Sequence, residues 1–165
     1  MDKKQITIIS ILSVLLVAII TFTIIITTRE TEPDIREFEA PQFDESAISG
    51  SPEVDESLNY RELAIAEGFK FSMCGNLTLE NNSCVVYFTS SADNDVWLLM
   101  KIYDKEGNLL GNSGLLRPGE YLKSIELSKS ITSDTPITVK VLSYEPDTYF
   151  SHGSASANLV IKAGS

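Results

Sequence analysis

The chain has 165 residues and a formal net charge of −10, a length that suits one compact domain and leaves little for a second core. The charge is uneven, because residues 29–59 hold ten acids against two arginines and sum to −8, whereas residues 60–165 hold twelve acids against nine bases and sum to −3. The only adjacent pair of bases is Lys3-Lys4. The chain therefore offers no basic surface that could release counterions from phosphates, and nucleic-acid binding is disfavoured.

The first predicted element is a transmembrane helix over residues 6–28. From Ile6 to Ile26, 21 residues include sixteen apolar side chains, five Ser or Thr, and no charge. About 20 such residues span a bilayer core as a helix. The stretch is longer than a signal-peptide core and lacks a small-residue cleavage pattern before Arg29, which favours a retained signal-anchor. The lysines in residues 1–5 predict a cytoplasmic N-terminus, a single-pass protein of the cell membrane and an extracytoplasmic C-terminal domain.

Residues 29–59 have the composition of a disordered acidic tether. Ten acids and the prolines at 33, 41 and 52 accompany few large apolar residues, so this segment cannot bury enough surface to offset the entropy of ordering. Ile35, Phe38 and Phe43 lie among the acids at irregular spacing. They are either a short partner-docking motif or incidental apolar residues of a linker.

Residues 60–165 have the pattern of an all-β domain. Short runs rich in Val, Ile, Tyr and Phe alternate with clusters of Gly, Asn, Asp and Pro, which is typical of a sandwich or barrel. We therefore predict an immunoglobulin-like β-sandwich of about seven strands. Apolar alternation places strands at residues 68–74, 77–79, 84–88, 96–104, 109–113, 120–128, 137–144 and 154–163. The side chains that this alternation predicts to share an inward face are Phe69, Phe71 and Met73, then Val96, Leu98, Met100 and Ile102, then Ile137, Val139 and Val141, and finally Ala155, Ala157, Leu159 and Ile161, with Trp97 and Leu99 on the opposite face of their strand.

Local signals predict the turns between these strands. Asn81-Asn82 suits the positive φ of a two-residue hairpin, Lys105 to Asn108 forms the turn after the most apolar strand, and Pro118-Gly119 forms a tight turn. Leu58 to Glu67 is the only helical candidate in this domain. That segment is short enough for an extended conformation to compete with a helix.

Several segments together resemble a group of small, largely uncharacterised membrane-anchored proteins of Gram-positive bacteria. The similarity covers about residues 64–162 and implies an exported β-sandwich, with no catalytic residues to transfer. The segments that carry it are Asn94 to Trp97, Gly107 to Leu110, Ser113 to Tyr121, and Tyr144 to Tyr149 followed by Gly153.

The candidate binding residues lie mainly in one aromatic loop. Tyr144, Tyr149, Phe150 and His152 surround Pro146 between the last two predicted strands. Aromatic side chains on a sandwich loop can anchor a protein or stack on sugars. A Tyr-rich loop folded over the core edge is the structural alternative.

Two further residues are binding candidates, Arg117 at a loop tip and Trp97 on the most apolar strand. Arg117 would contact an acidic partner, and Trp97 would stack on a sugar. The structural alternative for residues 114–121 is a turn in which Leu115 and Leu116 close the end of the core.

Cys74 and Cys84 could form a disulfide in an oxidising compartment, or they could be two buried thiols. With Asn81-Asn82 at the turn, Cys84 should face Leu79 and Cys74 should face Thr89, so the disulfide needs a kink or a cross-sheet contact. The short run Asp93 to Asp95 offers oxygen ligands but lacks the rest of a calcium loop, and a turn accounts for it equally well. We predict no metal site and no cofactor.

The sequence favours a non-enzymatic role. His152 is the only histidine, and no nucleophile elbow, phosphate-binding loop or zinc-binding helix motif occurs. Our first hypothesis is a membrane-anchored extracytoplasmic module that binds a protein partner in a cell-envelope, transfer or secretion assembly. The alternative is a module that binds cell-wall carbohydrate.

Overall fold

The computed structural model describes residues 39–64 and 68–163. The predicted membrane span over residues 6–28 and the first part of the tether lie outside the described residues. Residues 39–64 and 68–163 contain no helix that could span a membrane.

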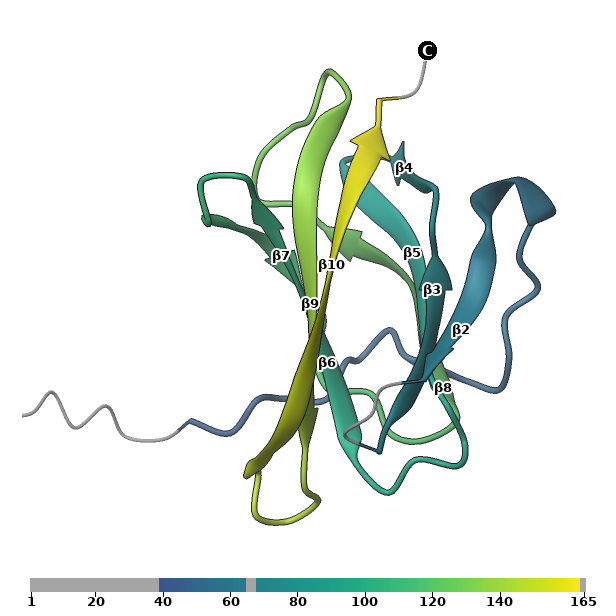
Figure 1. Ribbon diagram of the computed structural model, residues 1–165, viewed down its shortest axis with the longest axis vertical. Helices are drawn as coiled ribbons and strands as arrows, with labels where there is room; N and C mark the ends of the chain where they lie inside the picture. The colour runs from purple at the N-terminus through teal and green to yellow at the C-terminus, as the bar shows by residue number, and fades with distance from the viewer. Residues whose placement is uncertain (1–38, 65–67, 164–165) are drawn as a thin grey trace, which may run out of the picture. The chain divides into compact units, whose positions relative to one another are not determined.

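Strands are the main secondary structure of the described residues, and turns and loops connect them (Figure 1). One turn of 3₁₀ helix, η1 (Glu56–Leu58), precedes most of them. The all-β prediction is therefore confirmed. The strands are β1 (Ile48–Ser49), β2 (Tyr60–Ala64), β3 (Lys70–Cys74), β4 (Leu77–Glu80), β5 (Ser83–Ser90), β6 (Trp97–Asp104), β7 (Leu109–Asn112), β8 (Glu120–Glu126), β9 (Thr135–Tyr144) and β10 (Ser151–Lys162).

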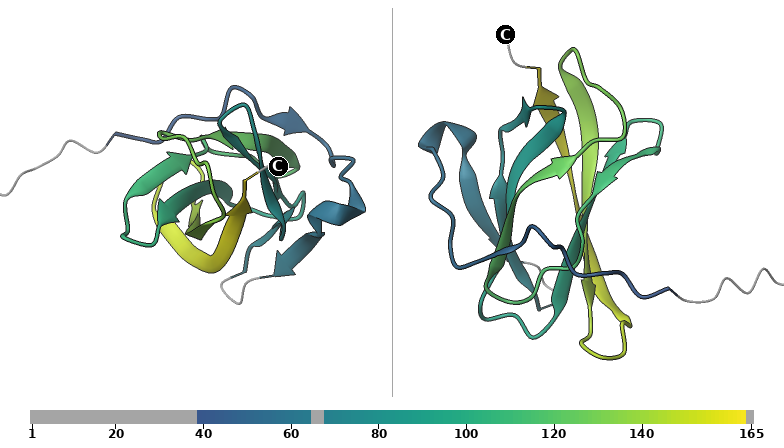
Figure 2. Two further views of the ribbon diagram at one scale, coloured as in Figure 1. Left: turned by 90° about the horizontal axis from the view of Figure 1, so that it is seen from above. Right: turned by 180° about the vertical axis from the view of Figure 1, so that it is seen from behind.

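The strands belong to one curled ten-stranded sheet (Figure 2). Its order is β1-β8-β5-β4-β10-β9-β6-β7, with β3 also pairing β5 and β2 pairing β3. Just after β8, the N–H of Ser128 donates to the carbonyl of Leu110 in β7 at 2.7 Å, so β7, at one end of this order, approaches β8, the second strand from the other end. Because the strands are joined in a single sheet, the immunoglobulin-like sandwich of about seven strands is not confirmed.

The approach of β7 to β8 depends on a glycine. A Cβ at Gly111 would lie 2.5 Å from the carbonyl oxygen of Glu126, closer than any real contact. A side chain at this position would push the strands apart, so Gly111 lets the sheet curl this tightly.

The core lies inside the curl and follows the predicted alternation. The residues predicted to point inward from β3, β6 and β9 are buried, and Leu99, on the opposite face of β6, is buried as well. A strand that is apolar on both faces lies inside the fold, as β6 does between β7 and β9. The buried inward residues are Phe71, Met73, Leu98, Met100, Ile102, Ile137, Val139 and Val141.

Residues 40–59 correct the prediction of a disordered tether. The strap, residues 40–50, pairs with the domain through a parallel bridge between Phe43 and Leu115. The N–H of Leu115 donates to the carbonyl of Gln42 at 2.9 Å, and the N–H of Asp44 donates to the carbonyl of Leu115 at 3.0 Å. The strap ends in β1, which is antiparallel to β8.

The strap and the residues that follow it are ordered because a few apolar side chains offset the entropic cost of ordering an acidic segment. Ala47, Val54 and Leu58 pack against the core, and the backbone completes hydrogen bonds at strand edges. The acids at 45, 53 and 56 stay exposed. Composition averages over the segment and therefore hides these contacts.

The helical candidate over residues 58–67 is extended from Tyr60 to Ala64, and only Leu58 belongs to the short 3₁₀ helix η1. After η1, Asn59 adopts a left-handed φ of 50°, and β2 then pairs antiparallel with β3. Pairing with a neighbouring strand outweighs the weak helical preference of so short a segment. Residues 65–67 lie outside the described part.

Two predicted turns are confirmed by their backbone geometry. Asn81 and Asn82 have φ values of 47° and 65°, and the hairpin places Leu79 opposite Cys84 as predicted. In the second turn Gly119 has a φ of 77°. The N–H of Glu120 donates to the carbonyl of Arg117 at 3.2 Å, which is the pattern of a type II turn with Pro at its second position.

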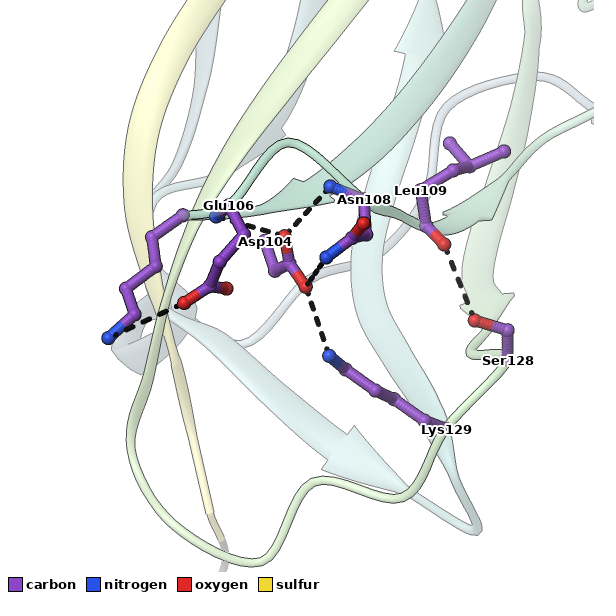
Figure 3. A network of polar contacts seen from close by, with 7 residues as sticks. Asp104, Glu106, Asn108, Leu109, Ser128 and Lys129 are labelled. Atoms are coloured by element: carbon purple, nitrogen blue, oxygen red, sulfur yellow. Dashed lines mark hydrogen bonds and ion pairs between the residues drawn. The ribbon is translucent and has the colours of Figure 1, made fainter.

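The β6–β7 turn is held by Asp104, which is only 5% exposed (Figure 3). Its carboxylate accepts hydrogen bonds from the N–H groups of Glu106 at 3.0 Å and Asn108 at 2.8 Å. It also accepts from the Asn108 side-chain amide and from the Lys129 ammonium, each at 3.0 Å. The Asn108 amide, together with the Asn108 N–H and Lys129, holds the pKa of Asp104 well below its ordinary value. The network joins this turn to the loop after β8.

Candidate binding site

Three aromatic side chains from distant parts of the chain form a row that we call the aromatic row: Phe43, Trp97 and Tyr149. The Phe43 and Trp97 ring centroids lie 4.8 Å apart at an interplanar angle of 76°. The Trp97 and Tyr149 centroids lie 5.3 Å apart at 61°. Both are edge-to-face contacts, a favourable geometry for aromatic pairs. All three side chains are half-buried.

Arg117 extends the row at the Phe43 end. Its guanidinium carbon lies 3.6 Å from the centroid of the Phe43 ring, in the position of a cation–π contact. Glu120 holds Arg117 from the other side of the turn. It accepts a hydrogen bond from the Arg117 N–H at 2.8 Å and lies 3.5 Å from the guanidinium.

The strap places Phe43 in the row, and Gly114 lets the strap approach. A Cβ at Gly114 would lie 2.5 Å from the nitrogen and 2.6 Å from the Cα of Asp44. In the present structure the Gly114 N–H instead donates to the Asp44 carboxylate at 2.8 Å. The absence of a side chain at position 114 therefore decides where Phe43 lies.

The loop between β9 and β10 places Tyr149 against Trp97 by a compact set of backbone hydrogen bonds. The N–H of Tyr149 donates to the carbonyl of Glu145 at 3.1 Å, and the N–H of Glu145 donates to the carbonyl of Phe150 at 2.9 Å. Asp147 and Tyr149 have positive φ values of 65° and 56°. Non-glycine residues in this region persist only when surrounding contacts hold them. The Trp97 contact is one such constraint on Tyr149.

Phe150 follows Tyr149 and has a different environment. Its side chain is 71% exposed, whereas its backbone is fixed by Glu145 and by the Thr148 hydroxyl, which accepts from the Phe150 N–H at 3.3 Å. His152 Nδ1 lies 3.8 Å from the Glu145 carboxylate, and both side chains are exposed. The loop tip thus presents a large apolar ring beside polar groups.

The structure brings together several of the residues singled out from the sequence. Trp97 and Tyr149 are in direct contact, Arg117 joins them through Phe43, and Tyr144 lies directly opposite Trp97 in the β6–β9 ladder. Tyr144 is half-buried, and burial together with nearby Tyr103 raises its pKa. Phe150 and His152 share the loop but have no ring contact with the row among the contacts of the described residues.

Sequence reasoning considered Phe43 only as part of a possible partner-docking motif in the linker and did not connect it with this site. Its position among the acids of a predicted linker gave no strand or loop signal. Arg117 was expected to contact an acidic partner, and the structure instead places it over Phe43 and beside Glu120 of its own chain. The predicted core role of Leu115 and Leu116 is confirmed, since both are fully buried.

The two cysteines are buried free thiols in this structure. Burial raises the pKa of Cys74 to about 11, and burial together with the neighbouring Cys74 raises the pKa of Cys84 to about 12. The sequence placed Cys74 opposite Thr89, but Ser72 faces Thr89 and Cys74 faces Tyr60. Thiols with raised pKa values are poor nucleophiles at neutral pH.

Asn94 lies at the centre of the run from Asp93 to Asp95 that was considered for calcium, and its side chain is hydrogen-bonded to other residues of the domain. Its amide oxygen accepts from the Lys70 N–H at 2.8 Å, and its nitrogen donates to the Lys70 carbonyl at 2.7 Å and to Ser90 at 3.1 Å. Asp93 is ion-paired with Lys70 at 3.9 Å. Within the residues described, no group of three or more His, Cys, Asp or Glu side chains is arranged to hold a metal.

Neither the protein-family models nor the curated proteins compared with this chain gave a match.

Proposed function

We propose that this chain is a non-enzymatic binding module, anchored in the cell membrane by residues 6–28, whose β domain presents the β9–β10 loop to a protein partner outside the cytoplasm. The partner would belong to a cell-envelope, transfer or secretion assembly. The exposed ring of Phe150 on a hydrogen-bonded loop is the observation that carries this proposal.

Phe150 has the properties of an interface anchor. A large ring that is 71% exposed leaves apolar surface in water, and burying it in a partner's pocket is favourable. The backbone bonds of the loop already hold this residue, so little conformational freedom is lost on binding. Glu145, Asp147 and His152 are exposed around it and would form a polar rim. The matching partner surface is an apolar pocket with basic groups at its edge.

The aromatic row supports a protein partner over a carbohydrate. A ring that stacks on a sugar needs an open face. One face of Phe43 is covered by Arg117, and Trp97 packs between Phe43 and Tyr149. These rings are engaged in holding the strap and the loop together. Phe150 remains available, and a protein pocket can enclose a single exposed ring more completely than a sugar can.

The ordered strap shortens the distance from the proposed anchor. Since the compact unit begins at Ala40, residues 29–39 alone connect it to the end of the predicted span. Eleven residues reach at most about 40 Å when fully extended. The domain would therefore meet partners close to the bilayer, where tethering raises their effective concentration.

In-cell photocrosslinking tests this proposal. A photoreactive phenylalanine at position 150 should capture a defined protein, and the same probe at Leu109, which is 46% exposed on β7, should not. Phe150→Ala should abolish capture by a second probe placed at Thr148. Equal capture from positions 150 and 109 would remove the loop as a specific surface. Retention of the β domain on purified cell-wall glycan, lost in Phe150→Ala, would instead favour the carbohydrate alternative.

A further inference from the structure

The strap is attached to the domain more weakly than the strands are attached to one another. None of its side chains, from residue 40 to residue 50, is fully buried. At its start the backbone is held by the two hydrogen bonds with Leu115, and the Gly114 N–H donates to the Asp44 carboxylate. Figure 2 shows the strap, in the view from behind, as the dark segment that crosses the strands. A segment of this kind opens locally at a lower free energy than the whole domain unfolds.

Phe43 connects the attachment of the strap to the aromatic row. Its ring contacts Trp97, and the Trp97 ring in turn contacts Tyr149. Trp97 is therefore held by one ring from the strap and one ring from the β9–β10 loop. When the strap opens, Phe43 is withdrawn, and Trp97 loses one of these two neighbours.

The loop end of the row has a strained backbone. Asp147 and Tyr149 have φ values of 65° and 56°, in a region that residues with side chains adopt at an energetic cost. Such a conformation persists only while surrounding contacts hold it. The edge-to-face contact with Trp97 is one of these contacts. A less firmly held Trp97 ring therefore constrains Tyr149 less, and with it the adjacent Phe150.

We propose that the strap is a switch for the β9–β10 loop: docking of Phe43 orders the loop for binding, and release of the strap loosens it. This inference rests on the proposed function, which assigns partner binding to Phe150. A loop that is already ordered loses less conformational freedom when a partner binds. Because coupling between two sites is reciprocal, a partner bound to the loop also holds the strap against the domain.

Release of the strap also changes the reach of the domain from the predicted membrane span. With the strap docked, residues 29–39 form the connection, and with the strap released residues 29–50 do so. Eleven residues extend to at most about 40 Å, and twice that number to about 75 Å. A pull beyond the shorter reach acts on the strap first, since the strap is the first part of the compact unit. The loop is thus ordered while the domain stays close to the bilayer, and it loosens when the domain is drawn away.

Hydrogen exchange of the full-length chain in detergent, without a partner, tests the switch. Phe43→Ala should speed exchange of the Tyr149 N–H, which donates to the Glu145 carbonyl, by about fivefold, the equivalent of one aromatic pair. Leu79→Ala is the matched control, because this half-buried residue of β4 packs against the core and has no contact in the row. It should weaken the domain and leave this exchange rate unchanged. Equal acceleration in both variants, or none in Phe43→Ala, would overturn the proposal.

Tyr149→Ala supplies the reciprocal measurement, and it does not require Phe43→Ala to fold. It should speed exchange of the Asp44 N–H, which donates to the Leu115 carbonyl, by a similar factor. Phe150→Ala, which truncates the adjacent exposed ring, should leave that rate at the wild-type value. An Asp44 rate that is unchanged in Tyr149→Ala would contradict the switch. Both measurements omit the partner, so a failure of partner capture would count against the proposed function and not against the coupling.

Discussion

The guanidinium of Arg117 lies over the ring of Phe43, with 3.6 Å between its carbon and the ring centroid. Seventy-four positions apart in the chain, these residues join an acidic N-terminal segment to the loop before β8. The contact continues through Trp97 to the β9–β10 loop. The stability of the strap and the geometry of the candidate binding loop are therefore linked.

Phe43→Ala should destabilise the domain by about 2 kcal/mol, because it removes an aromatic pair, a cation–π contact and buried apolar area. Urea unfolding measures the change. Trp97 is the only tryptophan, so its fluorescence should also shift in the folded variant as water replaces the Phe43 ring.

The matched control is Phe150→Ala, which truncates the same residue type where it is 71% exposed. Its stability should stay within about 0.5 kcal/mol of the wild type, with unchanged tryptophan emission. Equal losses in both variants would contradict the assignment of Phe43 as the residue that fastens the strap.

Gly114→Ala should displace the strap while leaving the sheet folded. The new Cβ would lie 2.5 Å from the nitrogen of Asp44, and overpacking of this kind costs about 1–3 kcal/mol. Limited proteolysis should then cut within residues 40–50, where the wild type resists. Ser130→Ala, at an exposed loop position, should keep the wild-type pattern. Unchanged resistance in Gly114→Ala would mean that the strap adapts without leaving the domain.

The Asp104 network predicts a loss of stability in acid. Its folded-state pKa is lowered, so the ionised carboxylate stabilises the fold fully above the unfolded pKa of about 3.9, and this contribution disappears as the pH falls through the folded-state pKa. Asn108→Ala removes the hydrogen bond that lowers the pKa most. It should reduce the urea midpoint at pH 7, and the difference from the wild type should shrink as the pH falls below about 4.

Asn112→Ala is the matched control for this pH profile. The Asn112 amide donates to a backbone carbonyl, that of Ser113, at 2.9 Å, and that bond involves no carboxylate. Its stability difference from the wild type should not change with pH. If the stability difference between Asn108→Ala and the wild type were also independent of pH, the Asp104 network would not be a cause of the acid sensitivity of the domain.

The cysteines should resist modification in the native protein. Both are buried free thiols, and their pKa values are raised to about 11 for Cys74 and about 12 for Cys84. A thiol reagent at pH 8 should therefore leave the folded chain unlabelled and label two sites after denaturation without reductant. Absence of label after denaturation would reveal a Cys74–Cys84 disulfide.

Much of the sheet could be predicted from local sequence. The alternation of Val96, Leu98, Met100 and Ile102 indicated both the strand and its inward face, and all four side chains are buried. Asn81-Asn82 identified a hairpin because few residue pairs tolerate two positive φ values in succession. These features arise from interactions within a few residues, which a single sequence displays.

The candidate site was only partly visible in the sequence. Trp97, Tyr149 and Arg117 were selected as separate binding candidates, but nothing indicated that they meet. Phe43 connects them from a segment whose composition predicted disorder. Composition could not reveal that the segment containing Phe43 forms backbone hydrogen bonds with Leu115. It also could not reveal that the lack of a side chain at Gly114 lets this segment approach.

By itself, the sequence determined where the strands from β3 to β10 form and which faces most of them bury, because side-chain alternation and turn preferences are local properties. Tertiary structure alone decided that ten strands join in one curled sheet and that the strap pairs with Leu115 and with β8. The reason is that pairing between distant strands depends on shape and backbone hydrogen bonding. Backbone groups are the same in every residue and therefore leave little trace in the pattern of side chains.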